Sequence, residues 1–151
     1  MKIEDVLKTS AALSLPKKTV LNIMYTQNII SEKLNEVFKY YDISTEQFNV
    51  LRILRGQRGK PANMCMIQER MIAKTSNTTR LVDKLLIKEL VTREVCVENR
   101  RKMEIFITEK GLKLLDAMDP KVNECEESFT KNFTESELET LNLLLEKYRT
   151  F

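Results

Sequence analysis

The strongest constraint on the fold is a change in hydrophobic period within residues 67–108. One stripe of an α-helix recurs at i, i+3, i+4 and i+7, and this spacing is met by Thr78, Leu81, Val82 and Leu85. Beyond Glu89 the period falls to two, first along residues 91–98 and again along residues 102–107. The polar, mostly basic residues 98–102 lie between these runs. The stretch therefore predicts a helix followed by a two-stranded hairpin.

A shorter helical pattern precedes this helix. Met64, Ile67 and Met71 share one face, and Asn63 is placed to cap the helix at its start. A joint of three to four residues, 72–75, separates the two patterns. Two short helices at that separation predict a helix-turn-helix, and the hairpin that follows extends it to a winged helix.

The face opposite the apolar stripe carries groups suited to DNA. Hydroxyls and an amide at a helix start, followed by cations one turn apart, can meet base edges and phosphates in a major groove. The candidates to contact bases or flanking phosphates in the major groove are Ser76, Asn77, Thr79 and Arg80. The candidates to pair with phosphates are Lys74 and Lys84. The candidates to reach the minor groove or its rim are Arg100, Arg101 and Lys102. Taken alone, the polar start is better explained by helix capping.

These segments resemble the MarR/SlyA family of winged-helix repressors. The family pattern is a Leu-Ala-Glu-Arg-Leu-like first helix, a Thr-Arg-Leu-Val-Asp-Arg-Leu recognition helix, an Asp-Arg-Arg wing tip and a Leu-Thr-Glu-Lys-Gly entry into the next helix. The chain has Ile67-Gln-Glu-Arg-Met71, Thr79-Arg-Leu-Val-Asp-Lys-Leu85, Asn99-Arg-Arg101 and Ile107-Thr-Glu-Lys-Gly111. The resemblance is specific because four segments agree in order and spacing.

The resemblance implies a homodimer that binds double-stranded DNA at a palindromic operator. It also implies a pocket between the dimer helices and the winged lobe, where a small aromatic or phenolic anion acts as effector. Candidates to line that pocket are Met24, Tyr25, Tyr40, Tyr41 and Phe48. Aromatic and methionine side chains at helical spacing more often belong to a core.

Two departures from the family pattern concern the wing and the turn that leads into it. The acidic residue of the wing tip is Asn99 here, so its usual ion pair with Arg101 becomes at best a hydrogen bond between a neutral and a charged group. The glycine that usually follows the recognition helix is Glu89, which is strained if its backbone stays left-handed. These departures affect the expected angle of the wing and not its existence.

The net charge of +3 is unevenly distributed along the chain. Residues 50–110 carry fourteen basic and seven acidic side chains, whereas residues 1–49 carry six of each and residues 111–151 carry five basic and nine acidic. Charge alone indicates only a solvated surface. Its coincidence with the helix-turn-helix and the hairpin predicts a DNA-binding lobe attached to another lobe.

Longer helices are predicted on both sides of this lobe. Residues 1–15 are expected to form a short helix that ends before Pro16, and a helix of about 24 residues, or about 36 Å, should run from Lys17 to Tyr41. Residues 44–47 form a capping box for a helix that reaches about residue 57. The cations on or near that helix offer further phosphate contacts or simply solubility: Arg52, Arg55, Arg58 and Lys60.

Two more helices are expected after the hairpin. The first should turn Leu112, Leu115, Val122, Cys125, Phe129 and Phe133 inward and should kink or break near Asp119, because Pro120 restricts the residue before it. The last opens with a capping box at residues 134–137 and is rich in leucine. We interpret residues 1–43 and 111–151 as a dimerisation lobe, with the core of a monomer as the alternative. The predicted fold is mainly α with a small β-hairpin (α+β), with the winged helix-turn-helix in residues 44–110.

Catalytic chemistry is poorly represented in the sequence. There is no histidine, no Gly-rich phosphate loop and no Gly-x-Ser-x-Gly motif, so we expect no enzyme, no cofactor and no metal site.

Cys65, Cys96 and Cys125 are expected to be reduced and buried, with a redox switch as the alternative. A signal pattern and an apolar run of eighteen residues are both missing, which predicts a cytoplasmic protein outside the membrane. The alternative function is a winged-helix module that binds protein and not DNA. Such a module would have an acidic or apolar wing tip, whereas the tip of this chain is mostly basic.

Overall fold

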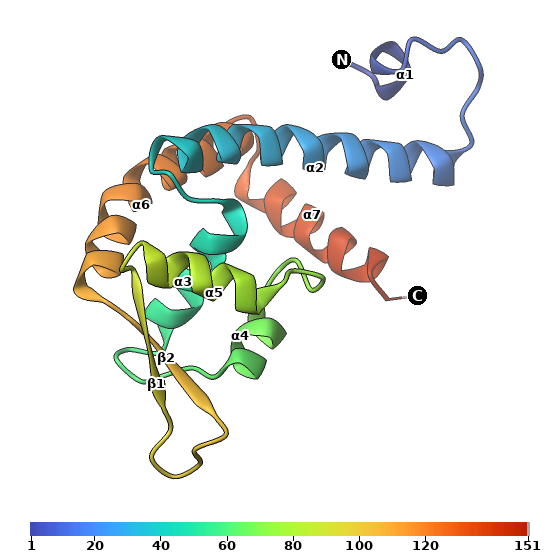
Figure 1. Cartoon of the computed structure of the whole chain (residues 1–151). Coiled ribbons are helices and arrows are strands. Elements are labelled where there is room, and N and C mark those ends of the chain that lie inside the picture. The colour runs from blue at the N-terminus through green and yellow to red at the C-terminus, as the bar shows by residue number, and fades with distance from the viewer. Residues whose placement is uncertain (151) are drawn as a thin grey trace.

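The computed structural model describes residues 1–150, which form seven helices and one two-stranded sheet (Figure 1). The elements in chain order are α1 (Ile3–Val6), α2 (Leu15–Tyr40), α3 (Thr45–Gly56), α4 (Met64–Arg70), α5 (Thr78–Ile87), β1 (Val91–Val95), β2 (Met103–Ile107), α6 (Glu109–Thr130) and α7 (Glu135–Tyr148). The prediction of a mainly α chain with one hairpin is confirmed.

The winged lobe consists of α3, α4, α5 and the hairpin. The predicted capping box begins α3, since the Ser44 hydroxyl accepts from the Gln47 N–H and the Gln47 side chain accepts from the Ser44 N–H. Strands β1 and β2 pair antiparallel, with Val91 opposite Ile107 and Val95 opposite Met103. The core of this lobe is built from buried side chains of its helices and of the hairpin, among them Leu51, Leu54, Ile67, Val82, Leu85 and Ile105.

Two long helices cross above this lobe and share its core. Phe38 near the end of α2 and Leu115, Met118 and Val122 in α6 belong to the same buried cluster as the side chains of the winged lobe. Helix α5 and the long helices are therefore joined by continuous apolar packing. In Figure 1 the N-terminal half of α2 projects beyond the winged lobe.

The start of the chain differs from the prediction. Only residues 3–6 are helical, and Pro16 lies in the first turn of α2, which begins at Leu15. Proline is favoured there because a backbone N–H in the first turn has no partner within the helix, so its absence costs nothing, and because the φ angle of proline suits a helix. Helix α2 thus has 26 residues and is about 39 Å long.

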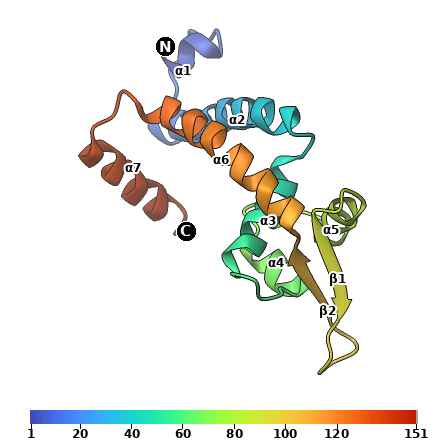
Figure 2. The ribbon, with the colours of Figure 1, turned by 90° about the vertical axis from the view of Figure 1, so that its left-hand side faces the viewer.

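Of the kink or break predicted near Asp119, the break is wrong. Helix α6 continues through Pro120, and its ribbon bends along its length (Figure 1). The other C-terminal helix, α7, opens with the predicted capping box at Thr134 and Glu137, yet none of its residues is buried. Figure 2 shows α7 and α5 on opposite sides of the molecule, with the hairpin projecting below. Among the described residues, no helix has the length and apolar character needed to cross a membrane.

Candidate DNA-binding surface

Two asparagines fix where the helices of the helix-turn-helix begin. The Asn63 side-chain oxygen accepts from the Met66 N–H at 2.8 Å, and that of Asn77 accepts from the Arg80 N–H at 3.1 Å. Helix α5 therefore begins at Thr78, and Ser76 lies half-buried in the turn before it. Because the oxygen of Asn77 serves as the cap, its NH2 group is the part left for DNA.

Helix α5 separates an apolar face from a polar one, as its sequence predicts. Val82 and Leu85 are buried, whereas Thr79, Arg80 and Lys84 are exposed. Within the described residues, no ion pair involves Arg80 or Lys84. The helix thus presents a hydroxyl and two uncompensated cations to solvent.

Side chains also connect the turn to α4. The Lys74 ammonium donates to the Glu69 carbonyl in the last turn of α4, and the Thr78 hydroxyl donates to the side-chain oxygen of Gln68. The Gln68 NH2 group donates in turn to the Lys74 carbonyl. Lys74, predicted to meet a phosphate, is held here at a helix C-terminus, where a cation is favourable.

The wing tip is short and cationic. Beyond the last strand pair, the Cys96 N–H donates to the Lys102 carbonyl at 2.9 Å and the Lys102 N–H donates to the Asn99 carbonyl at 2.8 Å. The Asn99 side-chain oxygen accepts from the backbone N–H of Arg101 at 3.1 Å, so it shapes the tip. Arg100, Arg101 and Lys102 are exposed, and no ion pair of the described residues engages them.

Contacts at the base of the hairpin set its angle to α5. Arg93 of β1 pairs with Asp83 of α5 at 2.9 Å. Glu89 adopts the left-handed conformation expected for the family glycine, with φ of 59°. Its carbonyl accepts from the Thr108 hydroxyl at 2.8 Å, and its carboxylate pairs with Lys110 at 3.1 Å. The exit from α5 therefore retains its usual geometry although glycine is absent.

Comparison with known proteins identifies the family. Residues 43–103 match the model of the MarR family. The chain is 31% identical over 144 residues to the helix-turn-helix-type transcriptional regulator YpoP of Bacillus subtilis (strain 168), and the match covers 93% of this chain and 96% of YpoP. The chain belongs to the MarR family.

Two further comparisons agree with this assignment. The helix-turn-helix-type transcriptional repressor IacR of Pseudomonas putida is 30% identical over 122 residues, which span 81% of this chain and 69% of IacR. The organohalide-sensing regulator RdhR-CbdbA1625, solved in its 2,4-dichlorophenol-bound form, matches the fold with a TM-score of 0.82 over 91% of this chain and 81% of its own, at 19% identity. This MarR-family chain is a DNA-binding transcriptional regulator and not an enzyme.

The five residues predicted to line an effector pocket lie in three places in this MarR-family chain. Met24 and Tyr25 are on the projecting half of α2. Tyr40 and Tyr41 meet edge to face, with ring centroids 5.0 Å apart, and line a hollow of about 300 Å³ with Val37 and Lys121. Phe48 is buried and stacks on Phe38, with ring centroids 4.7 Å apart.

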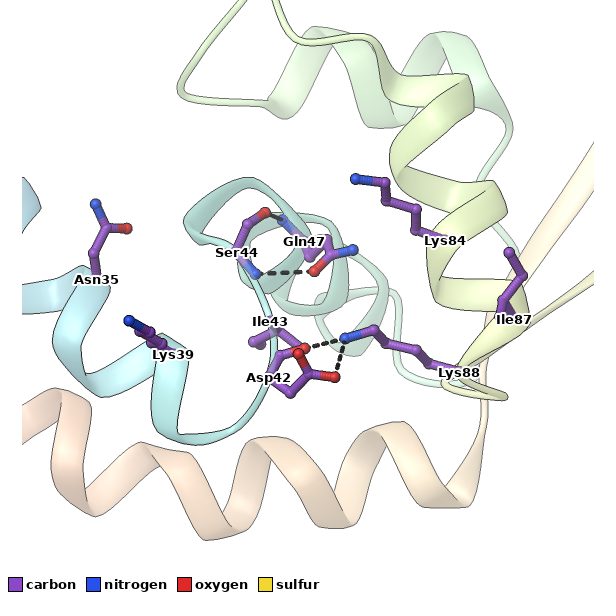
Figure 3. Close-up of a pocket in the computed structure, with 9 residues that line it drawn as sticks. All are labelled: Asn35, Lys39, Asp42, Ile43, Ser44, Gln47, Lys84, Ile87 and Lys88. Carbon is purple, nitrogen blue, oxygen red and sulfur yellow. Dashed lines mark hydrogen bonds and ion pairs between the residues drawn. The ribbon is translucent and has the colours of Figure 1, made fainter.

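A larger hollow, of about 600 Å³, lies between α2, α3 and α5 (Figure 3). Lys84 reaches into it from α5, as does Lys88, the residue that follows α5, and Lys39 borders it from the end of α2. Lys88 donates to both the carbonyl and the carboxylate of Asp42, which ties the end of α5 to the end of α2. The site was not predicted from the sequence, although Lys84 and Lys88 are one helical turn apart. We name it the lysine pocket.

Two further expectations need correction. Arg55, considered for a phosphate contact, instead donates to Asp119 of α6, whereas Arg52, Arg58 and Lys60 are exposed. The three cysteines are unpaired but not buried, since Cys65 is exposed and the other two are half-buried. A hydrogen bond to Glu69 raises the pKa of the Cys65 thiol, and burial raises that of Cys125. Raised pKa values oppose redox sensing by these two thiols.

Proposed function

We propose that this protein is a homodimeric repressor that binds a palindromic operator and releases it when a small phenolic or aromatic anion binds. The single observation that carries the DNA-binding part is the set of exposed cations on α5 and on the wing tip. Arg80, Lys84, Arg100, Arg101 and Lys102 are all exposed there and lack carboxylate partners among the described residues. Such cations neutralise phosphates and release counterions on binding.

Each DNA-facing residue has a proposed role. Ser76, Asn77, Thr79 and Arg80 contact base edges or flanking phosphates in the major groove, where α5 inserts its N-terminal residues. Lys74 and Lys84 pair with phosphates. The wing cations, Arg100 to Lys102, lie along the minor groove or its rim.

A second copy of the chain is proposed to cover α7 and the projecting half of α2. Helix α7 exposes Leu141, Leu143, Leu144 and Tyr148, and α2 exposes Leu15, Val20 and Met24. An apolar helix face is stable in water only when another surface covers it. A twofold dimer also suits a palindrome, because its two recognition helices meet half-sites about one helical turn apart. The dimerisation lobe of residues 1–43 and 111–151 is part of this proposal.

The effector is proposed to bind in the lysine pocket, which differs in place from the aromatic residues considered first. Three lysines around one hollow favour an anion, such as a carboxylate or phenolate. A related fold has been solved with bound 2,4-dichlorophenol. An anion that takes Lys88 from Asp42 would loosen the joint between α5 and α2, and it would also withdraw Lys84 from DNA. An effector acts only through such a difference in affinity between two states.

Salt-titrated DNA binding tests the proposal. Fluorescence anisotropy with DNA from upstream of the protein's own gene should give a logarithmic affinity that falls linearly with the logarithm of salt, by about 0.9 per neutralised phosphate. A shuffled duplex of the same length is the control, and its affinity should be at least about a thousandfold lower. Salt-insensitive binding to protein partners, with no preference for any duplex, would instead support an interaction module.

Two further measurements address assembly and the effector. Analytical ultracentrifugation should show a dimer, and Leu144→Glu, which places a charge on the exposed apolar face of α7, should shift it toward monomer. Asn142→Asp on the same helix is the charge control. Titration with 2,4-dichlorophenol at pH 8 should weaken operator binding, and Lys84→Met with Lys88→Met should abolish that response. A monomer with full operator affinity would contradict the dimer.

A further inference from the structure

Gln68 joins the two helices of the helix-turn-helix through both ends of its side chain. Its oxygen accepts from the hydroxyl of Thr78, the first residue of α5, and its NH2 group donates to the Lys74 carbonyl in the turn. Thr78 is only 6% exposed. A buried hydroxyl that loses its partner is costly, so this contact constrains where α5 starts.

The contact depends on a residue that departs from the family pattern. In Ile67-Gln-Glu-Arg-Met71 the chain has Gln68 at the position where the Leu-Ala-Glu-Arg-Leu-like pattern has alanine. An alanine side chain has no hydrogen-bonding group and cannot bridge the turn to α5. The Gln68 link, defined as the contacts from Gln68 to Thr78 and Lys74, is thus a feature that the pattern itself does not supply.

The link lies next to the proposed base-contacting residues. Asn77 and Thr79 flank Thr78 directly, and Arg80 follows one residue later. Asn77 is itself committed to the cap of α5 through the Arg80 N–H. A displacement of Thr78 therefore moves the Asn77 cap together with the exposed side chains of Thr79 and Arg80. Base contacts need donors and acceptors held within about 0.5 Å, whereas phosphate contacts of the distant wing tip do not depend on this turn.

We propose that Gln68 is a positioning residue that sets the sequence preference of this regulator by fixing the first turn of α5. This inference rests on the proposed function. Loss of the link should lower discrimination between operator and other DNA, because the base contacts become misaligned. It should leave binding to arbitrary DNA nearly unchanged, because the wing cations and Lys84 still neutralise phosphates.

Two near-isosteric variants break the link from opposite ends. Gln68→Met removes both polar groups at similar length, and Thr78→Val removes the hydroxyl at similar shape. Each should lower the ratio of operator to shuffled-duplex affinity by about tenfold, a change typical of one lost base contact. The salt dependence of binding to the shuffled duplex should not change. The double variant should lose no more than Gln68→Met alone, because Gln68→Met already removes the hydrogen-bond partner of the Thr78 hydroxyl.

Controls separate positioning from general destabilisation. Cys65→Ser alters an exposed α4 residue without changing charge, and Thr78→Ser keeps the hydroxyl, so both should retain the ratio. Amide hydrogen exchange at residues 74–80 should accelerate in Gln68→Met and Thr78→Val while the global unfolding free energy falls much less. An unchanged ratio in Gln68→Met, or fully additive losses in the double variant, would overturn the inference. If the unaltered protein shows no operator preference, the proposed function fails and not the role of Gln68 alone.

Discussion

Arg55 of α3 and Asp119 of α6 form a bidentate ion pair, with Nη1 2.6 Å from Oδ2 and Nη2 3.2 Å from Oδ1. The hydrogen bond to Asp119 raises the pKa of Arg55, because it favours the charged guanidinium. The pair joins the winged lobe to α6 at the residue before Pro120, where that helix loses a backbone hydrogen bond.

Breaking this pair should weaken the attachment of the winged lobe to α6. Both side chains are about one-third exposed, at 33% and 37%, so water screens the interaction. Asp119→Asn should therefore lower the free energy of unfolding by about 1 kcal/mol, at the upper end for a partly exposed pair. Urea denaturation at fixed protein concentration measures it. A cycle with Arg55→Lys should show coupling, since lysine cannot reproduce two parallel bonds. Glu124→Gln, in an exposed pair with Lys121, should have no measurable effect.

Gly111 lies where a side chain has no space. A Cβ atom there would be 2.4 Å from the Leu90 carbonyl oxygen and 2.8 Å from Cγ1 of Ile107. Gly111→Ala should destabilise the protein by about 2–3 kcal/mol, because the segment between α5 and β1, strand β2 and the start of α6 must separate. Gly56→Ala is the matched control, since its Cβ meets nothing within 4 Å; it should be neutral or stabilising by up to about 1 kcal/mol. Equal effects in thermal unfolding would contradict the packing at Gly111.

Glu89 carries backbone strain that glycine would relieve. Its φ of 59° is left-handed, which costs an L-residue about 1–2 kcal/mol. Glu89→Gly should raise the unfolding free energy by about 0.5–1 kcal/mol, because part of the relief is offset by the greater entropy of unfolded glycine. Glu89→Ala removes the same exposed ion pair with Lys110 but keeps the strain, so it should not stabilise. A stabilised alanine variant would show that the carboxylate, and not the backbone, is unfavourable.

Local signals made most of this fold predictable. The caps at Asn63, Ser44, Thr108 and Thr134 each depend on groups within three residues of one another, so the sequence alone contains both partners. The winged helix was predictable because the hydrophobic period changes from that of a helix to that of a strand, and this period indicates which element a segment forms. The extent of β1 was overestimated because alternation continues to Val97, whereas the tip closes early through the bond from Lys102 to Asn99.

Contacts between distant segments were not predictable from the pattern. The lysine pocket needs residues 35–47 and 84–88 to meet, and the Gln68 link needs a particular angle between α4 and α5. Neither is encoded in a spacing along the chain. Similarly, the five aromatic and methionine residues proposed for an effector share a helical pattern that says nothing of which neighbour each side chain meets. The structure separates them along α2 and α3.

The thiol of Cys65 should react slowly although it is exposed. Its pKa is raised by the hydrogen bond to Glu69 and by that carboxylate's charge, so less thiolate exists at a given pH. Glu69→Gln should lower the pKa of Cys65 and increase its alkylation rate by iodoacetamide at pH 7.5, with the rate curve shifted to lower pH. Cys96→Ser and Cys125→Ser in both backgrounds isolate the signal. A rate that does not respond to Glu69→Gln would exclude this hydrogen bond.

The wing and α5 should make different contributions to DNA binding. Arg101 lies in the exposed tip, where it is proposed to neutralise a phosphate or enter the minor groove, whereas Arg80 is proposed to contact bases. Arg101→Gln should weaken binding to operator and shuffled DNA alike and lower the salt slope by about 0.9. Arg80→Gln should lower operator affinity by about 1–3 kcal/mol more than shuffled-duplex affinity. Lys131→Gln, an exposed cation at the end of α6, is the charge control. Equal losses on both duplexes for Arg80→Gln would reassign that residue to phosphate contact, and the base contacts would then have to come from Ser76, Asn77 and Thr79.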